Sequence, residues 1–147
     1  MTEREGLSHH PAPKAEQLST TKAWFMLAGG AGAWFVQLCF GYGLLSWSCY
    51  PYDIRLATPL PGYGGSLLAT LIVSIACAIV ALLSGYVSRR SFEEVKDEHG
   101  GSHEEHLHTG QGRTRFIAHW GMILGFSFAA TIVATFVAFA LVPRCAG

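Results

Sequence analysis

The chain alternates between polar segments and three long blocks of apolar residues. The first block, residues 23–47, and the second, residues 66–88, contain no charged residue, and the third, residues 116–142, has His119 as its only ionisable side chain. A helix of 25 residues is roughly 37 Å long, which is enough to cross the roughly 30 Å hydrocarbon core of a bilayer. The pattern therefore predicts an all-α integral membrane protein with three transmembrane helices.

A soluble three-helix bundle is the alternative interpretation of these blocks. The exposed faces of soluble helices carry charged residues every few positions, and these blocks carry none. A cleaved signal peptide is also disfavoured, because 22 mostly polar residues precede a first block that is far longer than a signal sequence requires. We expect residues 1–22 to form a polar tail and residues 23–147 to form the membrane domain, with a flexible His-rich loop at 89–115.

Lys and Arg residues are distributed unevenly between the two predicted sides of the membrane. The side that holds the N-terminal tail and the loop 89–115 carries eight of them, whereas the opposite side carries only Arg55 and Arg144. Because positive charges are retained in the cytoplasm, this count predicts a cytoplasmic N-terminus and a periplasmic C-terminus.

Composition narrows the classes of function. Half of the residues are hydrophobic and 14% are charged, mean hydropathy is +0.32, and ten Lys and Arg residues balance ten Asp and Glu residues. Without a basic excess, nucleic acid is not expected as a partner. The apolar blocks contain no acidic residue, and the chain has neither an HExxH motif nor a phosphate-binding loop. We therefore expect a protein that is not an enzyme and holds no cofactor.

Small residues recur at spacings of four in the first and third blocks. In lipid, such residues let helix backbones approach closely, which supplies much of the attraction between helices. Gln37 shares the first stripe at mid-membrane, where an unpaired amide is costly, so we expect it to hydrogen-bond to another helix rather than to bind a ligand. The predicted helix-packing residues are Gly29, Ala33, Gln37 and Gly41 in the first block and Gly121, Gly125 and Ala129 in the third.

The four cysteines separate by predicted location. Cys39 and Cys77 lie within apolar blocks, whereas Cys49 and Cys145 closely follow the first and third blocks. The predicted orientation puts this second pair on the periplasmic side, where disulfides persist, so we predict a Cys49–Cys145 bridge. A copper or redox pair is the alternative, but the segments on that side offer no His or Met as further ligands.

Histidines supply two candidate metal sites. In the loop, His103 and His106 would share a helical face and His106 and His108 a strand face, so either pair could bind a divalent metal and make the protein metal-responsive. Glycines flank these residues, which favours a solvated linker. His119 could ligate haem, but it lies near the membrane boundary, and the apolar blocks contain no second histidine.

Two segments carry a resemblance to known proteins: AWFVQLCFGYGLLSWSC, and RFIAHWGMILGFSFAATIVATFVAFALVPRC. They resemble small uncharacterised bacterial membrane proteins encoded beside haem–copper oxidase and oxidase-assembly genes. The chain departs from that pattern by Arg144 and by its long His-rich connection. The matching positions are Trp34, Tyr42, Cys49, Arg115, Phe116, Gly121, Phe128, Pro143 and Cys145.

The resemblance implies a location and a partner. The location is the bacterial inner membrane, crossed several times, and the role is that of an accessory or assembly partner of a respiratory terminal oxidase. We expect such a protein to contact lipids and other membrane subunits through its small-residue stripes. A haem- or redox-bearing small subunit that uses His119 is the alternative.

Overall fold

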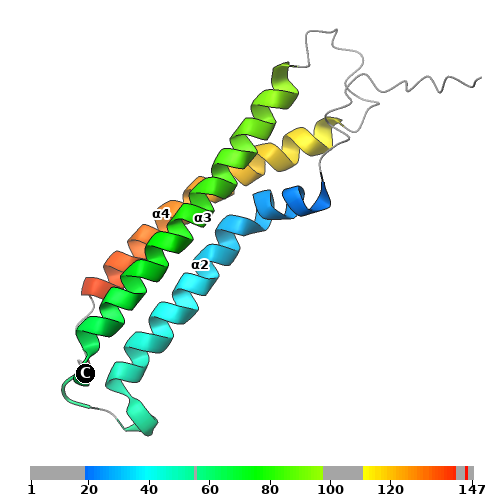
Figure 1. The fold of residues 1–147 in the computed structure, drawn as a ribbon. Helices are drawn as coiled ribbons and strands as arrows, with labels where there is room; N and C mark the ends of the chain where they lie inside the picture. The colour runs from blue at the N-terminus through cyan, green and yellow to red at the C-terminus, as the bar shows by residue number, and fades with distance from the viewer. Residues whose placement is uncertain (1–18, 55, 98–110, 142–144, 146–147) are drawn as a thin grey trace, which may run out of the picture.

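The computed structural model describes residues 19–54, 56–97, 111–141 and 145. These ranges form the helices α2 (Thr20–Cys49), α3 (Tyr63–Asp97) and α4 (Gln111–Leu141), with a single 3-10 turn, η1 (Pro51–Asp53), and no strand. Figure 1 shows the three long helices side by side, with α3 antiparallel to α2 and α4, and each helix contacts the other two. All three are long and apolar enough to cross a membrane, so the predicted all-α, multi-pass architecture is confirmed.

The helices are longer than the apolar blocks that predicted them. With 30, 35 and 31 residues, they extend about 45, 52 and 46 Å, well beyond the roughly 30 Å hydrocarbon core. The predicted loop 89–115 is correspondingly shorter, because α3 continues to Asp97 and α4 begins at Gln111. A helix can continue past the last uncharged residue, so the apolar blocks predict the spans but not the helix ends.

Two ion pairs accompany the added turns of α3. Arg89 pairs with Glu93 at 3.0 Å and Arg90 pairs with Glu94 at 3.2 Å, both one helical turn apart. Such exposed pairs each add a few tenths of a kcal/mol to a helix, roughly 0.2–0.5. They support the helix where it has left the apolar region.

Large apolar side chains lie on the outside of the bundle. Trp24 and Tyr42 of α2 are each 67% exposed, and Ile72 of α3 and Val133 of α4 are also exposed. In the described part of the chain, the buried apolar side chains are Met26, Ala33, Cys49, Cys77, Ala81, Ala118, Ala129 and Ile132. This distribution is the reverse of a soluble protein and fits a molecule whose outer surface is in contact with lipid.

Seven of the eight buried residues of α3 recur at alternating spacings of four and three, and the eighth, Gly85, directly follows Ser84. This spacing keeps one face of a helix against its neighbours, as in left-handed helical bundles. All seven residues are small, which allows the neighbouring backbones to come close. They are Thr70, Ser74, Cys77, Ala81, Ser84, Ser88 and Ser91.

The closest approach of the helices is at glycine. A Cβ atom placed on Gly125 of α4 would lie 2.5 Å from the Cα of Gly85 in α3, and one placed on Gly30 of α2 would lie 3.3 Å from the Cα of Gly125. A Cβ on Gly121 would lie 2.9 Å from the backbone oxygen of Met26. Gly125 is therefore the residue at which all three backbones meet.

We predict that Gly125→Ala destabilises the bundle by about 1–3 kcal/mol, because the added methyl group overlaps the backbone of Gly85. Gly32→Ala is the matched control, since a Cβ at Gly32 meets no atom within 4 Å. Thermal unfolding of the purified chain in mild detergent, followed by circular dichroism, measures both. Equal stability of the two variants would contradict the role of Gly125.

Candidate functional site

A buried amide connects α2 to α3 near the middle of the bundle. Gln37 is fully buried, and its Nε2 donates a hydrogen bond to Oγ of Ser74 at 3.3 Å. Ser74 in turn donates to the backbone oxygen of Thr70 at 2.7 Å. Gln37 is therefore placed in a helix interface, as its position at mid-membrane led us to expect. Its Oε1 has no hydrogen-bond partner within the described residues.

Two further polar contacts cross the interior. Ser84 of α3 donates to the backbone oxygens of Phe25 at 2.9 Å and Met26 at 3.2 Å in α2. Trp34 of α2 donates from Nε1 to Oγ1 of Thr135 in α4 at 3.3 Å. A serine hydroxyl can reach carbonyl oxygens on another helix only where the backbones are close, so the bonds of Ser84 depend on the small residues around them.

Trp34 also stacks against α4. Its ring centroid lies 5.7 Å from that of Phe128, in a tilted arrangement. Both residues are positions of the resemblance, and nothing in the sequence pairs them. Periodicity within one helix contains no signal for a contact with a residue on another helix.

The predicted packing residues lie mostly inside the bundle. Six of them are buried: Ala33, Gln37, Gly41, Gly121, Gly125 and Ala129. Gly29 is only partly buried and faces Ser84 of α3, whereas Gly30 is the α2 residue that faces Gly125. In the described chain these stripes face the other two helices, so they are packing surfaces within the bundle. The expectation that they also contact other membrane subunits stays a prediction.

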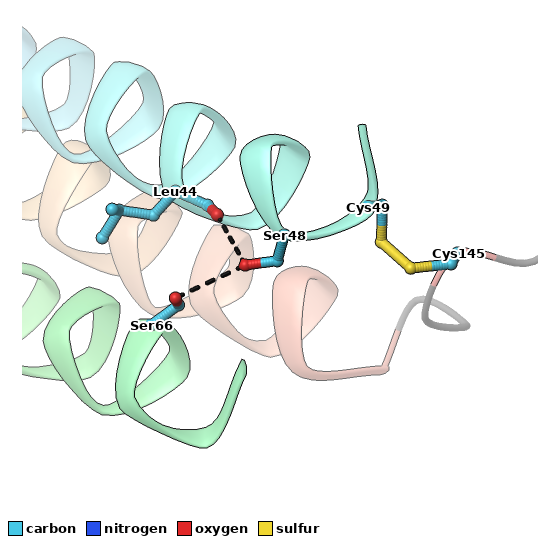
Figure 2. The surroundings of a disulfide bond; sticks show 5 residues. All are labelled: Leu44, Ser48, Cys49, Ser66 and Cys145. Atoms are coloured by element: carbon cyan, nitrogen blue, oxygen red, sulfur yellow. Dashed lines mark hydrogen bonds between the residues drawn. A yellow bond between two sulfur atoms is a disulfide. The ribbon is translucent and has the colours of Figure 1, made fainter. Parts of the chain in front are cut away.

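A disulfide closes one end of the bundle. Cys49 at the end of α2 is bonded to Cys145, which follows α4, with their Cα atoms 5.3 Å apart. The predicted bridge is therefore present. Figure 2 shows beside it Ser48, whose hydroxyl donates to the backbone oxygen of Leu44 at 3.0 Å and to Oγ of Ser66 in α3 at 3.4 Å. Together these bonds hold the ends of all three helices.

The loop between α2 and α3 folds back over this end. The backbone nitrogen of Leu56 donates to the oxygen of Cys49 at 3.0 Å, and that of Leu60 donates to the oxygen of Ser48 at 3.1 Å. Tyr52 is held in the left-handed region at φ 55°, is 82% exposed, and packs edge-on against Trp47. A non-glycine residue in this conformation persists only where its surroundings hold it, and such residues cluster at functional positions.

We define the outer aromatic surface as Trp47, Tyr50 and Tyr52, all three exposed beside the disulfide. The disulfide and the two loop hydrogen bonds order the backbone that carries it. Aromatic side chains supply large contact areas at low entropic cost, which is why they are frequent at protein interfaces. Three large aromatic side chains are thus exposed together at this end of the bundle.

The remaining candidate ligands, His119 and the two unbridged cysteines, lie away from the disulfide-closed end. His119 is exposed on α4 and packs against Phe92 of α3, with 5.9 Å between ring centroids. It is the only histidine among the described residues, and these residues contain no group of three His, Cys, Asp or Glu side chains that could hold a metal. Cys39 is exposed and Cys77 buried, both unbridged. The candidates His103, His106 and His108 lie outside the described residues, so that metal site stays a prediction.

Fold and site together define a small multi-pass membrane protein with a close-packed interior and one disulfide-closed end. No protein-family model matches the sequence, and no curated protein or solved structure matches it.

The interaction of Gln37 with Ser74 predicts a measurable coupling. In a double-mutant cycle of Gln37→Leu and Ser74→Ala, we expect a coupling free energy of about 0.6 kcal/mol, the mean for hydrogen bonds between membrane helices. Chemical unfolding in mixed micelles measures it. Pairing Gln37→Leu with Ser84→Ala is the control, because Ser84 bonds elsewhere on α2 and should show no coupling. Equal coupling in both cycles would refute a specific contact.

The disulfide predicts a second stability effect. Cys49→Ser should lower the free energy of unfolding by about 2–4 kcal/mol, towards the smaller value because membrane insertion already restricts the unfolded chain. Cys39→Ser should leave it unchanged, since Cys39 is unbridged. Thermal unfolding with and without reductant measures both variants. An intact wild-type chain that is insensitive to reductant would contradict this prediction.

Proposed function

We propose that the chain is a non-enzymatic accessory or assembly protein of a respiratory terminal oxidase, located in the bacterial inner membrane. The observation that carries the proposal is the outer aromatic surface, which the Cys49–Cys145 bridge holds in place. An exposed tyrosine in the left-handed region, on a hydrogen-bonded loop, is a feature expected of a docking surface.

The interior supports a role in interaction rather than in chemistry. The buried polar residues of the described chain are one amide, Gln37, and seven hydroxyls. None of these side chains titrates near neutral pH or is a favoured transition-metal ligand. The approach of Gly30, Gly85 and Gly125 also leaves no space for a planar cofactor between the helices at that point. Partners are therefore expected to meet the outside of the molecule.

The partner and the orientation rest on the sequence. The resemblance through Trp34, Tyr42, Cys49 and the segment 115–145 supports the oxidase as partner. Eight Lys and Arg residues against two support a cytoplasmic N-terminus and a periplasmic C-terminus. A disulfide at the C-terminal end agrees with that orientation, because the periplasm is oxidising.

Affinity purification from membranes of the source bacterium tests the proposal. We expect oxidase subunits to co-elute with the wild-type chain in mild detergent. Trp47→Ala combined with Tyr52→Ala should reduce their yield at least about tenfold, as expected when interface anchors are lost. Trp24→Ala is the matched control, because Trp24 is also exposed, at 67% against 56% for Trp47, but lies at the opposite end of α2. Mass spectrometry of the eluate measures the yield.

The same fractions distinguish the alternative function. Elution without oxidase subunits, or equal loss in the control variant, would contradict docking through the outer aromatic surface. A visible haem spectrum from the chain by itself, lost in His119→Ala, would instead identify a redox subunit.

A further inference from the structure

A cationic and aromatic surface lies at the end of the bundle opposite the disulfide. Arg115 and His119 on α4 are one helical turn apart, and both are exposed. Phe92 of α3 contacts both residues. The centroid of its ring lies 5.5 Å from the guanidinium carbon of Arg115 and 5.9 Å from the ring centroid of His119. Contacts across two helices thus hold this cluster.

Arg115 differs from the other arginines at this end. Arg89 and Arg90 are each bound to a glutamate of their own helix, whereas the contact of Arg115 is with the aromatic ring of Phe92 on the neighbouring helix. Stacking on an aromatic ring orients a guanidinium group and leaves its N–H donors free at the edge. The ring of Phe92 therefore orients the Arg115 guanidinium group, whose N–H groups are donors suited to an anion.

Two aromatic residues continue the surface towards the membrane. Phe116 is 63% exposed, Trp120 is 44% exposed, and their rings are 6.1 Å apart. Arg115 directly precedes residues 116–142, which contain no Lys, Arg, Asp or Glu, so one boundary of the roughly 20-residue span of the hydrocarbon core lies close to Phe116 and Trp120. Arg115 then lies at the depth of the lipid headgroups, and Phe116 and Trp120 lie where acyl chains begin.

We infer that this surface binds an anionic phospholipid: Arg115 contacts the headgroup phosphate beside Phe92 and His119, and Phe116 and Trp120 contact the first acyl carbons. A membrane lipid is the molecule that presents a phosphate and an acyl chain together at this depth. The inference is independent of the oxidase as partner, because it concerns the other end of the bundle.

Lipid retention by the full-length chain tests the inference. The chain is purified in neutral detergent, titrated with dioleoyl phosphatidylglycerol or dioleoyl phosphatidylcholine, and examined by native mass spectrometry. We expect about a fivefold preference for phosphatidylglycerol, the effect of one basic residue at the membrane surface. Arg115→Gln should abolish the preference, and Arg115→Lys should keep part of it.

Arg90→Gln is the matched control, because it removes the same charge from an exposed, glutamate-paired arginine and should leave the preference intact. Trp120→Ala provides a second test that changes no charge, and it should weaken retention of both lipids. Equal retention of the two lipids by the wild-type chain, or equal losses in Arg90→Gln and Arg115→Gln, would overturn the inference. Displacement of phosphatidylglycerol by millimolar inorganic phosphate would also overturn it, by identifying a site for free anions.

Discussion

Helices surrounded by lipid gain nothing by hiding apolar side chains from one another, so their association depends on how closely their backbones can approach. In this chain that approach is set by Gly30, Gly85 and Gly125, which bring three helices together without intervening side chains. The interhelical hydrogen bonds depend on the same distance, because the short side chain of Ser84 reaches carbonyl oxygens of α2 at 2.9 and 3.2 Å. Large side chains are then left to face the lipid.

The two ends of the bundle are held in different ways. At one end, the Cys49–Cys145 bond and the hydrogen bonds around Ser48 fix α2, α3, α4 and the connecting loop together. At the other end, the contacts of Phe92 with Arg115 and His119 join α3 to α4 without a covalent bond. A covalently closed end suits an ordered surface for a protein partner, and a charged, aromatic end suits the lipid headgroups.

Among the described residues, the buried polar side chains of the bundle are hydroxyl groups and one amide. Most buried hydroxyls donate to a carbonyl of their own helix, as Ser74, Ser88 and Thr70 do to the residue four positions earlier. Such bonds satisfy a polar group in lipid without creating reactive chemistry. Gln37 differs because it links two helices, yet its partner is again a hydroxyl. The buried polar groups therefore stabilise the bundle.

The sequence by itself determined the three spans and the all-α class, and it predicted the disulfide that the structure contains. Stretches of more than 20 residues without charge are compatible with few structures besides a membrane helix, and three spans place Cys49 and Cys145 on one side. Only the tertiary structure decided that Gly30 rather than Gly29 meets α4, that Trp34 pairs with Thr135, and that Arg115 stacks on Phe92. Periodicity shows that a helix has a contact face. The rotation of each helix about its axis is set by the packing of all three helices together, and the sequence of one helix carries no information about that packing.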